Sequence, residues 1–238
     1  MDNATYAILT RQSGLLSEMQ IVANNVANAQ TSGFKTEGLI FSEFISRLDH
    51  DRGDLSMAAA RVKSTDISQG SLSKTGGSLD LAIEGDGYFL VDTPQGQRLT
   101  RAGSFAPDAF GTLVTQEGNP VLDAGGAPVF IPTGSGPVGI AADGTVSVEG
   151  RAVGQLGLVV PADPSELRRQ TGTLFAAPSG IAPTAEAKIL QGFLEDSNVN
   201  PIEQIARMIE VQRSYELGQS FLELEDTRIR GVIEAMGR

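Results

Sequence analysis

Three groups of residues in this sequence have types and spacings that could support chemistry. In Asp49-His50-Asp51, a carboxylate could orient the imidazole as a general base. Asp80, Glu84 and Asp86 could gather around a cation, since carboxylate oxygens are the ligands that hard cations prefer. Gly85-Asp86-Gly87 resembles the beginning of a dinucleotide-binding loop.

Each of these groups has a simpler interpretation that the sequence favours. His50 lies in a polar stretch typical of a solvated loop, and the acids near Asp80 alternate as they would on the wet face of a strand. The glycine pair lacks the third glycine and the helix start of a dinucleotide loop, so it indicates a turn. Tyr88 and Phe89 next to it are better core residues than a ligand platform. We therefore expect no catalytic residues, no cofactor and no metal site.

Composition excludes further classes of function. The chain has 238 residues, no cysteine and one histidine, which excludes disulfide scaffolds, zinc–thiolate centres, cysteine nucleophiles and multi-histidine metal sites. A net charge of −11 argues against nucleic acid as a partner, because a phosphate-binding surface needs basic residues. No apolar run approaches about 20 residues, so we expect no membrane span. The opening MDNATYAILTRQ has no basic segment followed by an apolar one, so we expect no cleaved signal peptide.

Proline and glycine divide the chain into two ends and a middle. No proline precedes Pro94, and Pro201 is the only one after Pro183. Most of the 28 glycines and most of the negative charge fall in residues 36–197. The ends therefore favour long helices, and the middle favours turns and short strands.

Heptad patterns predict a helix at each end. Residues 3–28 carry apolar side chains at 4–3 spacing, with Gln12 as the polar exception, and end near Gly33. Asn200-Pro201-Ile202-Glu203 combines a cap residue, a first-turn proline and a glutamate, and predicts a helix to about residue 235. Gly218 and Glu225 interrupt its 4–3 repeat. Since each seam needs a partner to bury it, we expect the first helix to pack on the last. This could be a hairpin within one subunit, or a unit from which an oligomer or polymer is built.

The middle predicts short, mostly antiparallel strands, because the spacing leaves no room for crossover helices. The candidate strands are Leu79–Ile83, Gly87–Asp92, Thr112–Thr115, Asn119–Leu122, Val129–Ile131, Val138–Ala141, Thr145–Glu149 and Gln155–Val160. Turn signals at Pro94-Gln95-Gly96, Gly125-Gly126 and Asp143-Gly144 separate them. In residues 36–78, helical spacing at Phe41, Phe44, Ile45 and Leu48 competes with an extended arm, and Asp49 to Thr75 reads as loop or linker.

Asn24, Asn25 and Asn28 cluster at the end of the first helix, although asparagine is a poor helix former. Either the helix frays into a turn there, or the amides bond across a subunit interface and fix its register.

This stretch resembles the N-terminal signature of the flagellar rod and hook family. The resemblance is carried by the blocks Ala23–Asn28 with Thr31, Gly33, Phe34 and Lys35; Leu79–Ile83 with Gly85–Val91; Thr100–Phe105 with Gly111–Thr115; and Gln191–Asn200 with Gln212–Glu216. Within the family, the opening Met1-Asp2-Asn3, Ser13 and the short chain favour the proximal-rod type over the distal-rod type.

The resemblance implies a structural, non-enzymatic subunit of the basal-body rod. It implies an α+β fold: helices in 1–35 and 198–238, paired like a coiled coil, form the inner axial tube, with a linker or extended arm at 36–78 and a mostly antiparallel β-rich outer domain at 79–197. Its implied partners are copies of itself, other rod proteins and, during secretion without a cleaved signal, the flagellar export apparatus. Its implied location is the periplasmic rod.

The seam and the signature blocks together give the expected assembly interface. Its residues are Ile8, Leu15, Met19, Val22, Asn24, Asn25, Val26, Asn28, Gly33, Phe34, Ser197, Asn198, Val199, Met208, Val211, Tyr215, Leu222, Ile229 and Val232. Two other functions stay open on the residues alone. One is a β-domain binding module that its helices dimerise, and the other is an enzyme that uses the acids around Asp80–Asp86.

Overall fold

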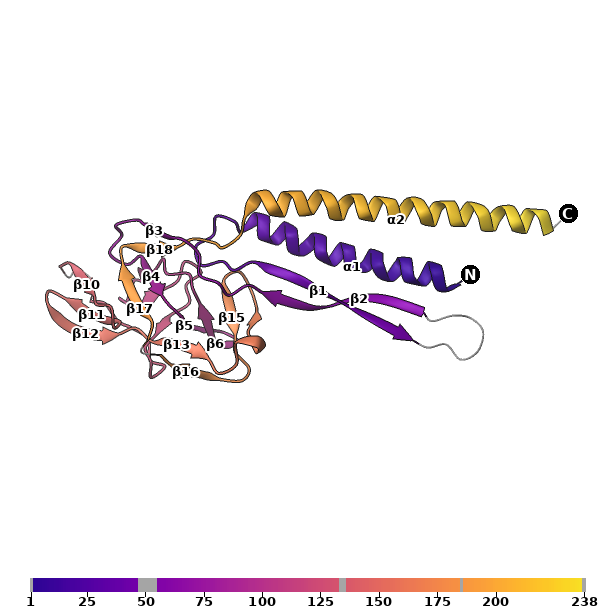
Figure 1. The fold of residues 1–238 in the computed structure, drawn as a ribbon. Helices are drawn as coiled ribbons and strands as arrows, with labels where there is room; N and C mark the ends of the chain where they lie inside the picture. The colour runs from indigo at the N-terminus through magenta and orange to yellow at the C-terminus, as the bar shows by residue number, and fades with distance from the viewer. Residues whose placement is uncertain (1, 47–54, 133–135, 185, 237–238) are drawn as a thin grey trace. The chain divides into compact units, whose positions relative to one another are not determined.

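The chain forms two compact units in a computed structural model that describes residues 2–46, 55–132, 136–184 and 186–236. Unit 1 comprises residues 1–27, 37–66 and 199–238, and unit 2 comprises residues 28–36 and 67–198. Both units are therefore assembled from segments that lie far apart in the sequence. The fold is α+β, with a helix at each end of the chain and antiparallel strands in the middle (Figure 1).

Unit 1 contains the two helices and a long β-hairpin. Its elements are α1 (Asp2–Ala27), β1 (Glu37–Ser46), β2 (Leu55–Thr65) and α2 (Pro201–Met236). Helix α1 contacts α2 and both strands of the hairpin. At 1.5 Å per residue, α1 is about 39 Å long and α2 about 54 Å. Both predicted helices are confirmed, with ends close to those that the sequence indicates.

Helix α2 begins where the cap signals predict. The Asn200 side-chain oxygen accepts from the backbone N–H of Ile202 at 3.1 Å and lies 3.5 Å from that of Glu203. Pro201 occupies the first helical position, where a missing N–H leaves no bond unmade. The Asn200 side chain thus accepts a hydrogen bond from a backbone N–H group that has no partner within the first turn of the helix.

Residues 37–46 are extended, which is one of the two alternatives that the sequence left open for them. Residues 55–65 form the second strand of a β-hairpin, where the sequence predicts a loop or linker. Strands β1 and β2 pair antiparallel from Glu37 opposite Thr65 to Ser46 opposite Leu55. The register shifts between Ile40 and Phe41, so the regular alternation that would mark a strand in the sequence is interrupted there. His50, its two neighbouring aspartates and Leu48 lie outside the described residues.

The described residues of unit 2 form sixteen short strands and one 3₁₀ turn, η1 (Pro164–Glu166). The strands are β3 (Leu72–Lys74), β4 (Leu81–Glu84), β5 (Tyr88–Thr93), β6 (Gly96–Thr100), β7 (Ala106–Pro107), β8 (Leu113–Val114), β9 (Val121–Leu122), β10 (Val138–Ile140), β11 (Thr145–Val148), β12 (Arg151–Gln155), β13 (Leu158–Pro161), β14 (Arg168–Arg169), β15 (Leu174–Ala176), β16 (Ile181–Pro183), β17 (Lys188–Gln191) and β18 (Phe193–Glu195). Every strand pairing that the structure describes is antiparallel, as predicted.

Strand β5 lies at the centre of the largest sheet, whose order is β14-β15-β6-β5-β13-β16, with β9 also paired to β5. Phe89 and Val91 face one apolar cluster, while Tyr88 and Leu90 face another. Both faces of β5 are buried, which explains its unbroken apolar run. The Phe89 ring packs edge-on against Phe105 at 5.1 Å between centroids. Tyr88 and Phe89 are therefore core residues, as expected.

Most predicted strands match observed ones, although the boundaries shift. The Pro94-Gln95-Gly96 turn joins β5 to β6, and Asp143-Gly144 joins β10 to β11. Residues 129–131 form no strand, and Phe130 makes an isolated bridge to Thr112. No helix within the described ranges is both long and apolar enough to cross a membrane.

Candidate assembly interface and a buried ion cluster

Polar contacts fix the direction and register of α1 against α2 in unit 1. Asn25 bonds Gln204 at 3.1 Å, the Glu18 carboxylate accepts from Arg207 Nε at 2.6 Å, and Gln12 Nε2 donates to the Tyr215 carbonyl at 3.1 Å. Residue numbers rise along α1 as they fall along α2, so the two helices run antiparallel. Polar contacts of this kind specify the register of two helices, because a shift along the helix axis would break them.

Two residues that look like defects in the separate heptad patterns lie against each other. Gln12 interrupts the apolar seam of α1, and Gly218 interrupts that of α2. A Cβ at position 218 would lie 2.5 Å from Gln12 Nε2. The glycine therefore makes room for the amide that reaches the α2 backbone.

The predicted interface residues have very different exposure. Those buried are Leu15, Val22, Asn25, Gly33, Phe34, Val199 and Val211; those half-buried are Ile8, Met19, Val26, Asn28, Ser197, Asn198, Met208, Tyr215 and Leu222; those exposed are Asn24, Ile229 and Val232. The seam at the middle of the helix pair is thus already occupied within one subunit. The end of α2 is not.

Asn25 connects three elements of unit 1 and is only 1% exposed. Its amide nitrogen donates to the Glu37 carbonyl at 2.8 Å, and its oxygen accepts from the Glu37 N–H at 3.0 Å. The same nitrogen donates to Gln204 Oε1. One side chain thereby makes hydrogen bonds to the backbone N–H and carbonyl of Glu37, the first residue of β1, and also reaches α2. This accounts for an asparagine inside a helix.

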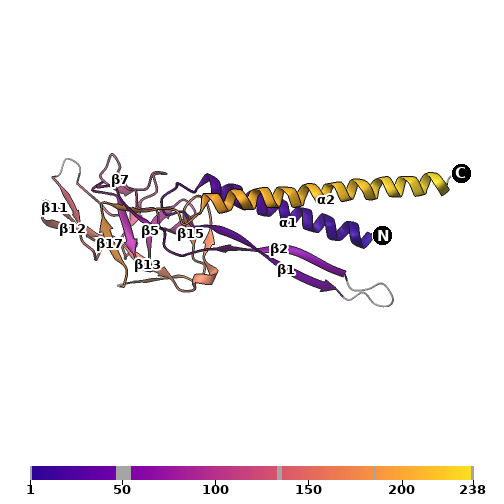
Figure 2. The ribbon, with the colours of Figure 1, turned by 45° about the horizontal axis from the view of Figure 1, so that its top comes forward.

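Helix α2 continues beyond the part that α1 accompanies. Figures 1 and 2 both show the C-terminal turns of α2 running past the first residues of α1. On those turns Ile229, Val232, Ile233 and Met236 are exposed, Met236 by 82%. Because Gln12 lies opposite Tyr215 in an antiparallel pair, residues after about 225 have no α1 residue to meet.

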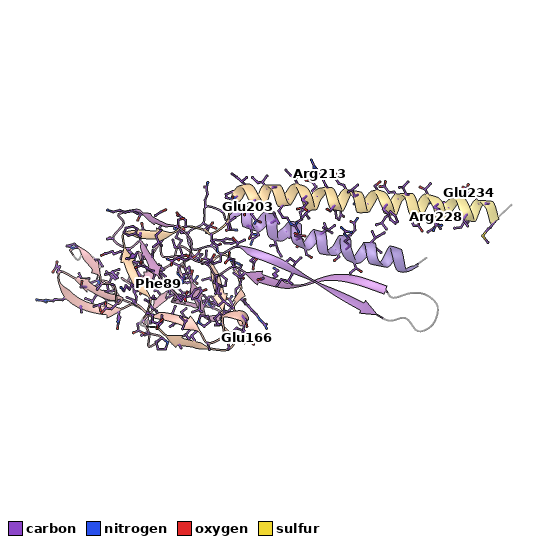
Figure 3. The ribbon with its side chains drawn as sticks, viewed as in Figure 1. Phe89, Glu166, Glu203, Arg213, Arg228 and Glu234 are labelled. Atoms are coloured by element: carbon purple, nitrogen blue, oxygen red, sulfur yellow. The ribbon has the colours of Figure 1, made fainter. Side chains whose placement is uncertain are left out.

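A second set of exposed apolar residues follows another face of α2 and is absent from the predicted interface. We call Ile202, Ile205, Ile209, Leu217 and Leu224 the outer stripe. Helical periodicity places them away from Val211 and Tyr215, and Leu217 is 73% exposed. Charged side chains such as Glu203 and Arg213 lie along the same helix (Figure 3). A helical-wheel plot of residues 201–236 would have revealed this stripe.

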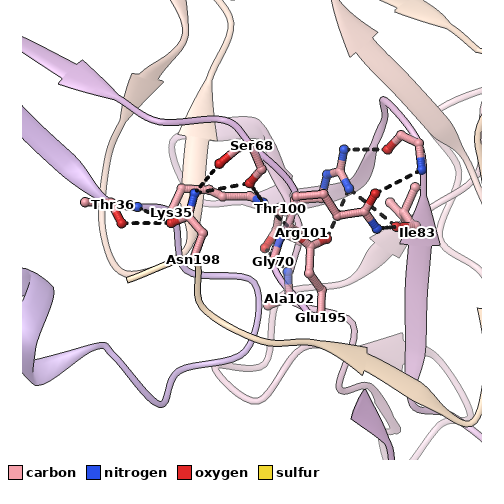
Figure 4. Close-up of polar contacts among 12 residues, drawn as sticks. Lys35, Thr36, Ser68, Gly70, Ile83, Thr100, Arg101, Ala102, Glu195 and Asn198 are labelled. Carbon is pink, nitrogen blue, oxygen red and sulfur yellow. Dashed lines mark hydrogen bonds and ion pairs between the residues drawn. The ribbon is translucent and has the colours of Figure 1, made fainter. Parts of the chain in front are cut away.

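Unit 2 holds a buried ion cluster of Lys35, Arg101 and Glu195 (Figure 4). One Glu195 oxygen accepts from Lys35 Nζ and from the Gly70 N–H at 3.0 Å, and the other pairs with Arg101 Nη1 at 3.0 Å. The side chains of Lys35 and Glu195 are fully buried, and that of Arg101 is 3% exposed. Removing one partner of such a group leaves a buried charge uncompensated.

The segment that brings Lys35 to this cluster is held on both sides. The Gly33 N–H donates to the Glu195 carbonyl at 2.7 Å, and Gly33 adopts a left-handed φ of 70°. The Arg169 guanidinium stacks over the Phe34 ring at 4.1 Å. Asn198 accepts from the Thr36 N–H at 2.7 Å. The N-terminal and C-terminal signature blocks of the sequence therefore meet within unit 2.

Tyr88 packs beside this cluster, with the Arg101 guanidinium 5.1 Å from its ring centroid. Burial raises the pKa of the Tyr88 phenol above its ordinary value, Arg101 lowers it in part, and the carboxylates of Glu195 and Asp86 raise it further. The folded protein thus favours the protonated phenol.

Unfolding should become easier as the pH rises past the ordinary range of tyrosine. Since the pKa is raised in the folded state, the contribution of Tyr88 is present below the unfolded pKa and is lost as the pH rises through the folded one. We expect Tyr88→Phe to weaken the alkaline loss of stability, measured as the urea midpoint against pH. Parallel pH profiles of the two proteins would contradict this.

The acidic residues considered for chemistry are dispersed. Asp80 accepts from the Thr75 hydroxyl at 2.7 Å, and Glu84 and Asp86 are exposed around the turn between β4 and β5. Within the described part of the chain, no three carboxylate or histidine groups are placed to hold a metal ion. This arrangement offers packing surfaces and a buried electrostatic contact, so the candidate site is an interface.

Comparison with known proteins agrees with the two signature blocks and the β-rich middle. Residues 8–35 match the family model "Flagella basal body rod protein", residues 82–148 match "Flagellar hook protein FlgE/F/G D1 domain", and residues 190–230 match "Flagellar basal body rod FlgEFG protein C-terminal".

Relatives match over nearly the whole chain. The chain is 41% identical to the flagellar basal-body rod protein FlgF of Caulobacter vibrioides, over 100% of this chain and 99% of the relative. It is 31% identical to FlgG of Bacillus subtilis over 98% of each, and 32% identical to FlgF of Salmonella typhimurium over 91% of each. The family is structural and not enzymatic. The two terminal helices, the antiparallel middle and these matches over nearly the whole chain lead to one conclusion: the chain belongs to the flagellar basal-body rod protein family.

Proposed function

We propose that this chain is a subunit of the proximal flagellar rod that assembles through its terminal helices. In this proposal, α1 and α2 form an antiparallel coiled coil, and such pairs pack side by side into a hollow helical shaft. The observation that carries the proposal is the apolar surface that the helix pair leaves exposed.

The contacts within unit 1 support the coiled coil. The seam residues Leu15, Val22 and Val211 are buried, and polar contacts at Gln12 and Asn25 fix the register. Two helices alone leave most of their circumference in water, so further helices are needed to cover the rest.

The exposed residues support contacts between subunits. The outer stripe and the last turns of α2 present isoleucine, leucine and methionine side chains to solvent. A groove of about 390 Å³ lies between the helices and offers space for a side chain of a neighbour. Its lining combines apolar and polar residues: Ile8, Arg11, Gln12, Leu15, Ser214, Leu217, Gly218 and Phe221. Contacts between unlike surfaces of this kind generate helical polymers when the rotation from one subunit to the next does not close into a ring.

The remaining predicted interface residues take supporting roles. Residues buried inside one subunit, such as Asn25 and Phe34, shape the surface that neighbours contact. The helices of 1–35 and 198–238 would line the axial tube, while the β-rich residues 79–197 would lie outside it.

The proximal position is supported by the relatives and by the start of the chain. The relative at 41% identity is named FlgF, while FlgG of Bacillus subtilis is 31% identical. The residues Met1-Asp2-Asn3 agree with this choice. The distal rod is the second candidate, because the FlgG match also spans almost the whole chain.

We also propose the partners and location that go with a rod. The subunit contacts copies of itself and other rod proteins in the basal body, in the periplasm. It is exported unfolded by the flagellar export apparatus.

Changing the outer stripe tests the proposal. The double variant Leu217→Gln/Leu224→Gln should fold normally, because both side chains are largely exposed, but should lose incorporation into rods and reduce swimming in soft agar severely. The double variant Glu216→Gln/Glu223→Gln changes exposed residues of the same helix and serves as the control. Wild-type swimming by the leucine double variant would reject assembly through this surface.

A further inference from the structure

The buried ion cluster in unit 2 contains two cations and one anion. Lys35 and Arg101 both pair with Glu195, and all three side chains are buried. Arg101 also donates to the Gly85 carbonyl at 2.8 Å, while its Nε has no acceptor. The Glu195 carboxylate is therefore shared by the two cations, and Lys35 Nζ also donates to the Ser68 carbonyl at 2.7 Å.

The single anion comes from the far end of the sequence of unit 2. Lys35 and Arg101 precede Glu195 by 160 and 94 positions. The same end contains β17, which pairs with β4, and β18, which pairs with β3. The Asp196 N–H also donates to the Ser71 carbonyl. Until this return segment is in place, Lys35 and Arg101 lack the Glu195 carboxylate, and β3 and β4 lack the strands that pair with them.

We propose that Glu195 is the closing residue of unit 2, which makes docking of residues 28–36 and 67–74 conditional on the return segment at 188–198. Without the Glu195 carboxylate, burying Lys35 beside Arg101 places two like charges in a low-dielectric interior. The ends of unit 2 then remain open, although the apolar cluster around Tyr88 and Leu90 contains no residue of the return segment. This inference concerns folding within one subunit and does not depend on the proposed function.

A double-mutant cycle of Lys35 and Glu195 distinguishes closure that depends on charge from closure that depends on packing. The distinguishing quantity is the sign of the interaction free energy between the two substitutions. Glu195→Gln keeps the shape of the side chain but raises the buried net charge by one unit. Lys35→Met lowers it by one unit and leaves Arg101 and Glu195 as a balanced pair. If charge governs closure, the second change relieves the first. If packing governs it, the two losses add.

The test uses urea unfolding of the full-length variants. We expect Glu195→Gln to lower the folding equilibrium constant roughly 10²- to 10³-fold, and Lys35→Met to lower it less. The double variant should be more stable than Glu195→Gln by roughly tenfold or more, even if the single variant is unfolded in water. Glu117→Gln, which removes an exposed carboxylate of the same unit, should leave the constant nearly unchanged.

Hydrogen exchange locates the effect. In Glu195→Gln, amides of residues 28–36 and 67–74 should exchange faster than in the wild type, while those of β5 should be affected least. A double variant that is no more stable than Glu195→Gln, or unchanged protection at both ends of unit 2, would overturn the proposal.

Discussion

Exchanging Gly33 for alanine should destabilise unit 2 by about 2–6 kcal/mol. Gly33 has a left-handed φ of 70°, which strains any residue that carries a Cβ. An added Cβ would also lie 2.3 Å from the backbone nitrogen of Ala102 and the carbonyl carbon of Arg101. Backbone atoms cannot move aside as a flexible side chain can. The Lys35 ammonium follows two residues later, so a displaced turn would also disturb its pairing with Glu195.

Urea unfolding with a matched glycine measures this effect. Gly118 has a similar φ of 84° in the same unit, but a Cβ there would meet nothing within 4 Å. Gly118→Ala should therefore show the backbone strain alone, about 1 kcal/mol. If Gly33→Ala and Gly118→Ala lowered the free energy of unfolding equally, the close approach of Gly33 to Ala102 would have no effect on stability.

Replacing Asn25 with aspartate should destabilise unit 1 by about 3–5 kcal/mol, although the two side chains have nearly the same shape. The carboxylate can still accept from the Glu37 N–H, but it offers no donor to the Glu37 carbonyl, which lies 2.8 Å from the original amide nitrogen. Gln204 can turn its amide to compensate, whereas the backbone carbonyl cannot. The variant therefore buries a negative charge against an acceptor.

Thermal unfolding followed by circular dichroism at the helical band checks this prediction. Gln20→Glu makes the same amide-to-carboxylate change at an exposed position of α1 and should have little effect. Acidification should partly restore Asn25→Asp, because a protonated carboxyl can donate to the Glu37 carbonyl. If both variants melt with the wild type, Asn25 does not hold the helix pair and β1 together.

The helices could be predicted from the sequence because their signals are local. Asn200 and Pro201 mark the start of α2 within a single turn, and the 4–3 spacing repeats along it. The turns at Asp143-Gly144 and Pro94-Gln95-Gly96 are local in the same way. Such features depend on neighbouring residues, and these are what a single sequence displays.

The hairpin β1–β2 could not be predicted, because its pattern is irregular. A register shift at Ile40 and Phe41 breaks the alternation, and Phe41, Phe44 and Ile45 then imitate helical spacing. Their backbone nevertheless lies in β1, paired with β2.

The contacts inside the candidate site were beyond prediction for a different reason. Lys35 and Glu195 both stand in the signature blocks, but nothing local shows that residues 160 positions apart share a buried contact. Gln12 and Gly218 each look like an interruption of a heptad, and only the fold shows that one accommodates the other. Asn25 belongs to the asparagine cluster that the sequence shows, and it lies inside α1 rather than in a frayed helix end. Its side chain bonds Glu37 and Gln204 of the same subunit.

Most of unit 2 is one continuous insertion, residues 67–198, between β2 and α2. Its two ends meet, since the Asn198 amide donates to the Ser68 carbonyl at 3.1 Å. Evolution or a designer could therefore enlarge, shorten or exchange the module of residues 67–198 through two junctions that lie close together. Residues 28–36, whose Phe34 and Lys35 are sheltered by the present module, are the other part of the chain that would have to be rewritten with it.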